Sequence, residues 1–94
     1  MLLLSRFVVN GHSMEPALRQ GQSVLASSIP YLVSKPKIGD IIFFKKDEKI
    51  FIKRVSKIDG DKYFVAGDNQ KDSMDSRKFG WINKSDILGK VIYY

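Results

Sequence analysis

Ser13 is the first residue whose surroundings suggest chemistry, because it follows His12, the single histidine, in the stretch GHSMEP (residues 11–16). A serine hydroxyl is a weak nucleophile until a neighbouring base accepts its proton. His12 is a poor candidate for that base, because consecutive side chains of an extended chain point to opposite sides. A histidine base also needs an acidic residue that orients it. We therefore expect His12 to lie exposed beside a substrate groove and not to act as the base.

A lysine far along the chain is the second candidate for the base. Side chains alternate between the two faces of a predicted strand over residues 50–58, which places Lys53 between Phe51 and Val55 on an apolar face. Such a lysine either extends its ammonium group into water or loses its charge, since desolvation lowers the pKa of an amine. A neutral lysine is a competent general base. Alternation alone favours the exposed ammonium, so the choice depends on the residues around Lys53.

The elements that must position these residues are mostly strands. Alternating and apolar stretches predict strands over residues 1–9, 22–27, 41–44, 49–58, 61–66 and 88–94. Asp59-Gly60 is a strong signal for a two-residue hairpin turn, and residues 67–86 read as a loop. A helical turn is predicted only at residues 14–19, where Pro16 is tolerated. The fold class is therefore all-β: a small curled sheet or partly open barrel that forms one domain over residues 1–94.

Composition narrows the classes of function. The 94 residues, 44% of them hydrophobic, can bury one modest core. The chain has no cysteine, which excludes disulfides and thiolate metal sites. Histidine and acidic residues form no cluster with metal-ligand spacing, so we expect no metal and no cofactor.

The formal net charge is +6, but the lysines are scattered through predicted turns. Neither a basic recognition helix nor an RNA-binding aromatic motif is visible, so we expect no nucleic-acid partner. An anionic membrane surface is a partner that this charge suits. The apolar start is shorter than the about 20 residues that span a bilayer and lacks the features of a secretory signal. We expect a peripheral membrane location without a transmembrane helix in this chain, or a cytoplasmic location.

Three motifs in order carry a resemblance to a known family. They are GHSMEPAL (residues 11–18), FIKRV (51–55) and GDNQKDSMDSRKFG (67–80), with GDIIFF (39–44) between the first two. This set closely resembles the type I signal peptidase family, which are serine endopeptidases with a Ser–Lys dyad on a largely β fold. The resemblance covers nearly the whole chain, and three motifs in this order are far more specific than one.

The resemblance implies a role for each matched residue. Ser13 would be the nucleophile, with its backbone N–H as an oxyanion donor, and Lys53 would be the base. Ser73 is similar to the serine that hydrogen-bonds the lysine amine and orients it. The residues implied to support the loop around Ser73 are Arg54, Asp68, Asn69 and an ion pair of Asp75 with Arg77. The alternatives are that Asp68 and Asn69 only form a turn, and that the ion pair is an ordinary surface salt bridge.

Two departures from the family pattern bear on the function. Some members use a serine two residues before the nucleophile as an oxyanion donor, and Gly11 stands there, so the second donor is unassigned. Only twelve residues precede Ser13 here, so we expect this chain to lack the membrane anchor, and also the large extra β region, of many signal peptidases. A compact member of the family without an anchor resembles the maturation proteases of nickel-type superoxide dismutase. These proteases remove an N-terminal extension from that dismutase.

The leading hypothesis is a serine endopeptidase that removes an N-terminal leader, signal or pro-sequence from a protein. It would bind an extended peptide as an added strand, with small residues before the scissile bond. One alternative is a dedicated maturation protease for nickel superoxide dismutase, and another is a catalytically silent β module that binds peptide or lipid. The self-cleaving repressors share a Ser–Lys dyad, but they carry a DNA-binding helix-turn-helix that has no counterpart here.

Overall fold

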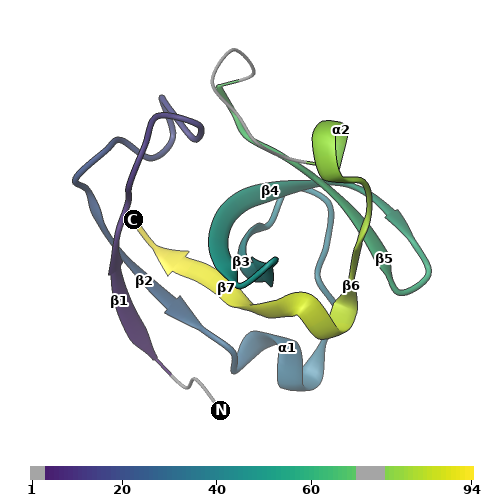
Figure 1. Cartoon of the computed structure of the whole chain (residues 1–94). Coiled ribbons are helices and arrows are strands. Elements are labelled where there is room, and N and C mark those ends of the chain that lie inside the picture. Colours follow the sequence, from purple (N-terminus) through teal and green to yellow (C-terminus); the bar gives the residue numbers. More distant parts are fainter. Residues whose placement is uncertain (1–3, 70–75) are drawn as a thin grey trace.

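The computed structural model describes residues 4–69 and 76–94, and its main feature is one antiparallel sheet of seven strands (Figure 1). The strands are β1 (Ser5–Val8), β2 (Ser23–Ser27), β3 (Ile41–Lys46), β4 (Lys49–Asp59), β5 (Lys62–Ala66), β6 (Ile82–Asn83) and β7 (Ile87–Tyr93). Their order in the sheet is β1-β2-β7-β3-β4-β5-β6, which leaves β1 and β6 as the two edges. The sheet curls without closing, so the predicted all-β fold class is confirmed.

Two hairpins build the centre of the sheet. The turn between β3 and β4 consists of Asp47 and Glu48, and both have positive φ angles, of 51° and 65°. The turn between β4 and β5 is centred on Gly60-Asp61, because Asp59 still pairs with Lys62 across the hairpin. The sequence signal therefore located this hairpin correctly but placed its turn one residue early.

The strand β3 is buried on both faces. Its first four residues, the run IIFF, are all buried, and consecutive side chains of a strand point to opposite faces. Two hydrophobic clusters therefore lie on the two sides of this strand. The first cluster contains Val9, Met14, Leu18, Val24, Ile41 and Val91. The second cluster contains Ile42, Phe44, Val55, Tyr63, Val65 and Ile82.

The strand β7 lies between β2 and β3 and passes very close to both. A Cβ atom on Gly89 would come within 2.5 Å of the Ser27 carbonyl oxygen and 2.6 Å of the Phe43 ring. No side chain fits in that space, so glycine is required for β7 to join the two parts of the sheet.

Short helices lie where the sequence did not predict them. They are α1 (Pro30–Val33), α2 (Ser76–Phe79) and the 3-10 turn η1 (Lys84–Asp86). The expectation that residues 14–19 hold the only helical turn was therefore wrong. That segment forms turns with one helix-type hydrogen bond, from Leu18 N to Met14 O at 2.9 Å. Helices of four residues are too short to produce a periodic sequence pattern, and α2, β6 and η1 all lie in the predicted loop 67–86.

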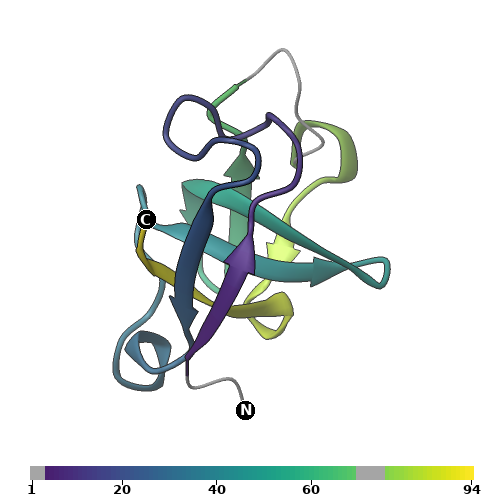
Figure 2. The same cartoon turned by 90° about the vertical axis from the view of Figure 1, so that its left-hand side faces the viewer.

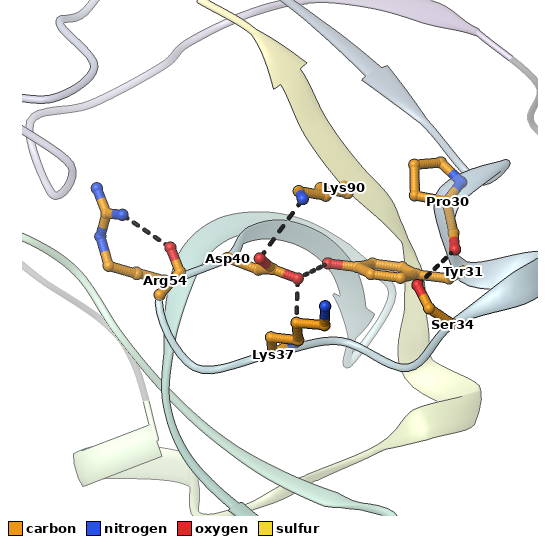
Figure 3. A network of polar contacts seen from close by, with 8 residues as sticks. Pro30, Tyr31, Ser34, Lys37, Asp40, Arg54 and Lys90 are labelled. Carbon is orange, nitrogen blue, oxygen red and sulfur yellow. Dashed lines mark hydrogen bonds and ion pairs between the residues drawn. The ribbon is translucent and has the colours of Figure 1, made fainter.

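A polar joint centred on Asp40 fastens α1 to the sheet (Figure 3). The Tyr31 hydroxyl and the Lys37 backbone N–H donate hydrogen bonds to Asp40 Oδ2, at 2.7 and 3.0 Å. Lys90 of β7 forms an ion pair with Asp40 Oδ1 at 3.5 Å. Burial and the hydrogen bond to the carboxylate both raise the pKa of Tyr31 far above its ordinary value. Asp40 thereby links α1, β3 and β7 at one point.

Candidate active site

Ser13 and Lys53 come together although they are far apart in the chain. Lys53 Nζ donates a hydrogen bond to Ser13 Oγ, with a distance of 2.6 Å between the two atoms. The lysine is only 4% exposed, so its amine does not extend into water. The structure therefore decides between the two alternatives left by strand alternation, in favour of the buried amine.

The surroundings of Lys53 are apolar. It lies in the middle of β4, opposite Ile42 of β3, and Val55 on the same face is also buried. The Phe51 ring centroid lies 6.0 Å from Lys53 Nζ. Burial of this kind disfavours the charged form of an amine, which is the property that a lysine general base needs.

The segment that contains Ser13 is held by a buried neighbouring residue and by hydrogen bonds from Asn69. The next residue, Met14, is buried in the first cluster together with Leu18. On the other side, Asn69 donates two hydrogen bonds to backbone carbonyls of this segment. Its backbone N–H reaches Ser13 O at 2.7 Å, and its side-chain Nδ2 reaches His12 O at 3.1 Å. In both views of the fold, the segment between β1 and β2 lies at the same end as the outgoing end of β5 (Figures 1 and 2).

An ion pair connects the strand of Lys53 to the segment of Asn69. Arg54 Nε and Nη2 donate to the two carboxylate oxygens of Asp68, at 3.0 and 2.9 Å. Arg54 Nη1 also donates to Gly39 O at 2.8 Å (Figure 3), and the hydrogen bond to Asp68 raises the pKa of Arg54. This two-pronged geometry orients both partners.

These contacts form a closed circuit around the Ser13–Lys53 pair. Lys53 touches Ser13, its neighbour Arg54 binds Asp68, and the neighbour of Asp68, Asn69, returns to Ser13. Sequence reasoning named all five residues but did not pair Arg54 with Asp68. One signal in the sequence could have suggested this pair. Consecutive residues of a strand point to opposite faces, so the partner of Arg54 must lie on the face of β4 that is opposite to Lys53.

Other predicted site residues are less fully described. Ser73 and Asp75 lie outside the described residues, and only the backbone of Arg77 is described, as part of α2. The roles implied for them stay predictions. His12 has a side chain that is 53% exposed, and its Nδ1 lies 2.9 Å from Glu15 Oε2. The hydrogen bond from His12 lowers the pKa of Glu15.

A cavity of about 240 Å³ adjoins the Ser13–Lys53 pair. It is lined by residues 7–10, Ser13, Met14 and residues 50–53, so it lies between the end of β1 and the start of β4. We call this cavity the groove. Most of its lining is apolar, and the polar side chains among its lining residues are Asn10, Ser13 and Lys53. Since β1 is an edge strand, one of its sides is available for an added peptide strand.

Comparison with known proteins identifies the family. The sequence model of the family "Signal peptidase, peptidase S26" matches residues 1–62 and 56–94, which together span the chain. The chain therefore belongs to the peptidase S26 family of signal peptidases, which are serine endopeptidases. None of the helices in residues 4–69 and 76–94 is long and apolar enough to cross a membrane.

Individual relatives agree with this assignment. Signal peptidase I of Buchnera aphidicola subsp. Baizongia pistaciae (strain Bp) is 40% identical over 67 residues, which cover 61% of this chain and 22% of that protein. Signal peptidase I of Bacillus caldolyticus is 24% identical over 143 positions, covering 97% of this chain and 79% of that protein. The inactive signal peptidase IA of Staphylococcus aureus (strain MRSA252) is 23% identical over 141 positions, covering 97% and 81%. The two longer alignments exceed the 94 residues of this chain, so those relatives carry additional residues within the aligned region.

Proposed function

We propose that this chain is a serine endopeptidase that removes an N-terminal leader or signal sequence from a protein substrate, with Ser13 as nucleophile and Lys53 as general base. The observation that carries the proposal is the buried Lys53 amine at 2.6 Å from the Ser13 hydroxyl oxygen. Family membership alone does not carry it, because one relative is named as inactive. The arrangement of nucleophile and base is what an active member requires.

The chemistry follows from the position of the amine. Neutral Lys53 accepts the Ser13 proton while Oγ forms a bond to the substrate carbonyl carbon. The resulting ammonium then gives that proton to the departing amine, which leaves an acyl group on Ser13. Lys53, neutral again, takes a proton from the water that attacks this ester, and gives it to Ser13 Oγ as the bond from Oγ to the acyl carbon breaks. Both halves of the cycle start from the uncharged amine, which burial favours.

The groove supports an extended peptide as substrate. A peptide added to the free edge of β1 would lie between β1 and the start of β4, with its scissile carbonyl at Ser13. The apolar lining and the small volume of about 240 Å³ suit short side chains before the scissile bond. The partner is therefore a polypeptide with small residues at these positions.

Residues around the dyad hold it in position. We assign this function to Asn69, through its hydrogen bonds to Ser13 O and His12 O, and to the ion pair of Arg54 with Asp68. Ser73 as the residue that orients the lysine, and Asp75 with Arg77 as a supporting pair, are carried over from the resemblance. A rigid set of such partners keeps nucleophile and base at reacting distance.

Several observations favour narrower or different functions. The additional residues of the longer relatives make this chain compact by comparison, which favours a dedicated maturation protease, with an N-terminally extended nickel superoxide dismutase as substrate. The relative named as inactive and the absence of a side chain at Gly11 favour a silent module that binds peptide or lipid. The net charge of +6 suits a peripheral location at an anionic membrane.

One experiment separates these functions. The purified protein is incubated with a secretory preprotein and, separately, with an N-terminally extended superoxide dismutase, and the new N-termini of the products are sequenced. Cleavage of the preprotein supports a signal peptidase, and cleavage of the dismutase alone supports the maturation protease. Ser13→Ala and Lys53→Met serve as controls that should both abolish cleavage. Binding without cleavage by the unmodified protein would favour the silent module, and cleavage by Lys53→Met at the unmodified rate would contradict the proposed mechanism.

A further inference from the structure

The proposed reaction creates a charge for which the site needs hydrogen-bond donors. When Ser13 Oγ adds to the carbonyl carbon, the electron pair of the C=O bond moves to oxygen, which becomes an oxyanion. Enzymes of this type stabilise that oxygen with donors already in place, and loss of one donor costs about 10²–10³-fold in rate. The backbone N–H of Ser13 makes no hydrogen bond to the described part of the chain, so it can serve as one donor. Gly11 has no side chain, so it contributes no side-chain donor.

Asn10 is the remaining polar side chain in the wall of the groove. It lines the cavity together with Ser13 and Lys53, while the other lining residues are apolar. Asn10 is exposed, and within residues 4–69 and 76–94 its amide makes no hydrogen bond. A primary amide carries two N–H donors. Asn10 thus carries uncommitted donors on a residue that lines the cavity where the oxyanion would form.

The backbone between Asn10 and Ser13 turns sharply. Gly11 has a φ angle of +98°, in the region that favours glycine. The chain leaves β1 at Val8 and changes direction at this glycine, so Asn10 and Ser13 both lie in the wall of the same cavity. In a straight strand, residues three positions apart would point to opposite faces.

We propose that the side-chain amide of Asn10 is the second oxyanion donor of this active site. The inference rests on the proposed function, since it concerns the same reaction. In the tetrahedral intermediate, the oxyanion accepts one hydrogen bond from Ser13 N–H and one from the Asn10 amide, while the Ser13 proton resides on Lys53. Both hydrogen bonds weaken when the intermediate collapses and the oxygen becomes a neutral carbonyl again. Asn10 therefore stabilises the transition state more than the bound substrate.

The competing role for Asn10 is simple peptide binding, and kinetics separates the two. A residue that binds substrate and transition state equally affects KM, whereas one that acts only in the transition state affects kcat. The substrate is a peptide with alanine at the first and third positions before the scissile bond. The variants are Asn10→Ala, which removes the amide, and Asn10→Asp, which keeps the shape but replaces the donors with a charged acceptor. Gln20→Ala is the matched control, because Gln20 is an exposed amide residue outside the groove lining.

We expect Asn10→Ala and Asn10→Asp to lower kcat by about 10²–10³-fold with little change in KM, and Gln20→Ala to leave both unchanged. In the Ser13→Ala background, the dissociation constant of the uncleaved peptide should be the same with Asn10 and with Ala at position 10. Thermal melting should not change, because the Asn10 side chain is exposed.

Three different results overturn the inference. If the unmodified protein cleaves the peptide, Ser13→Ala abolishes cleavage and Asn10→Ala retains the full kcat, the donor role of Asn10 is wrong while the proposed protease stands. A rise in KM alone also overturns it, in favour of peptide binding. If the unmodified protein cleaves none of the substrates tested, the protease proposal and the role of Asn10 fail together.

Discussion

Two lysines on either side of Ile42 show how position determines what a lysine can do. Ile42 of β3 pairs with Lys53 of β4 on one side and with Lys90 of β7 on the other. Lys53 is 4% exposed and donates to the hydroxyl of Ser13. The Lys90 side chain is 38% exposed and forms an ion pair with the carboxylate of Asp40. Water and a carboxylate both stabilise the charge of Lys90, whereas burial disfavours the charge of Lys53.

In the proposed mechanism Lys53 is the reactive amine, whereas Lys90, which lies within the same three strands, has a structural contact only. The joint at Asp40 connects α1, β3 and β7. The circuit through Ser13, Lys53, Arg54, Asp68 and Asn69 holds the site. Substitutions in the circuit should therefore affect the rate, and substitutions in the joint should affect stability.

The largest expected difference is between the two lysines themselves. Lys53→Met should lower kcat/KM by at least about 10³-fold, because Ser13 loses its base. Lys90→Met should leave kcat/KM close to the unmodified value and cost about 0–1 kcal/mol of unfolding free energy, as for a partly exposed ion pair. Peptide cleavage and chemical denaturation of both variants give the two quantities. Equal losses of activity would show that the two lysines do not differ in function.

A smaller effect on rate is expected at Asn69. Asn69→Ala removes the side-chain hydrogen bond to His12 O but keeps the backbone bond to Ser13 O. We expect kcat to fall by about 10–100-fold, because a small displacement of the nucleophile lowers the rate, while KM stays close to its unmodified value. Asn83→Ala is the matched control, since Asn83 is an exposed amide residue at the start of η1 and outside the groove lining. If both variants lose only stability, Asn69 has no positioning role.

At Asp40 we expect the reverse of the effect at Asn69, namely a loss of stability without a loss of rate. Asp40→Ala removes the hydrogen bonds from Tyr31 and Lys37 and the ion pair with Lys90. We expect a loss of about 1–3 kcal/mol of unfolding free energy, because the carboxylate side chain is only 14% exposed and several donors lose their partner. Cleavage measured well below the melting temperature should retain its kcat. A fall in kcat without a loss of stability would place Asp40 in the active-site circuit instead.

The sequence predicted the strands better than the connections, for a physical reason. Alternation and apolar runs located β3, β4 and β5, because burial acts directly on the side-chain pattern. The pairing of Arg54 with Asp68 depends on how distant strands meet, and no local pattern encodes it. The helices α1 and α2 are one turn long and lack a periodic pattern, and the tight passage at Gly89 depends on Ser27 and Phe43.

For the site, the sequence predicted which residues matter but not how their side chains lie. The three motifs singled out Ser13 and Lys53, and the structure brings these two residues into contact. Strand alternation could place Lys53 on an apolar face but could not decide whether its amine reaches water. That answer depends on the curl of the sheet, which brings the segment after β1 against β4. Asn10 gave no signal in the sequence, because the role proposed for it depends on the wall of the groove that it shares with Ser13.

Titration of the lysine side chains by NMR tests the central claim most directly. In protein with ¹³C-labelled lysine, Lys53→Met identifies the signal of Lys53. We predict that Lys53 loses its proton at a lower pH than a free lysine side chain does, because burial disfavours its ammonium form, and that kcat/KM rises with pH through the same transition. Because the unfolded chain then binds more protons than the folded one, stability should also rise with pH in this range. A Lys53 signal that titrates in the ordinary range of a free lysine would contradict the account, because the amine beside Ser13 would then carry its proton and could not act as a base.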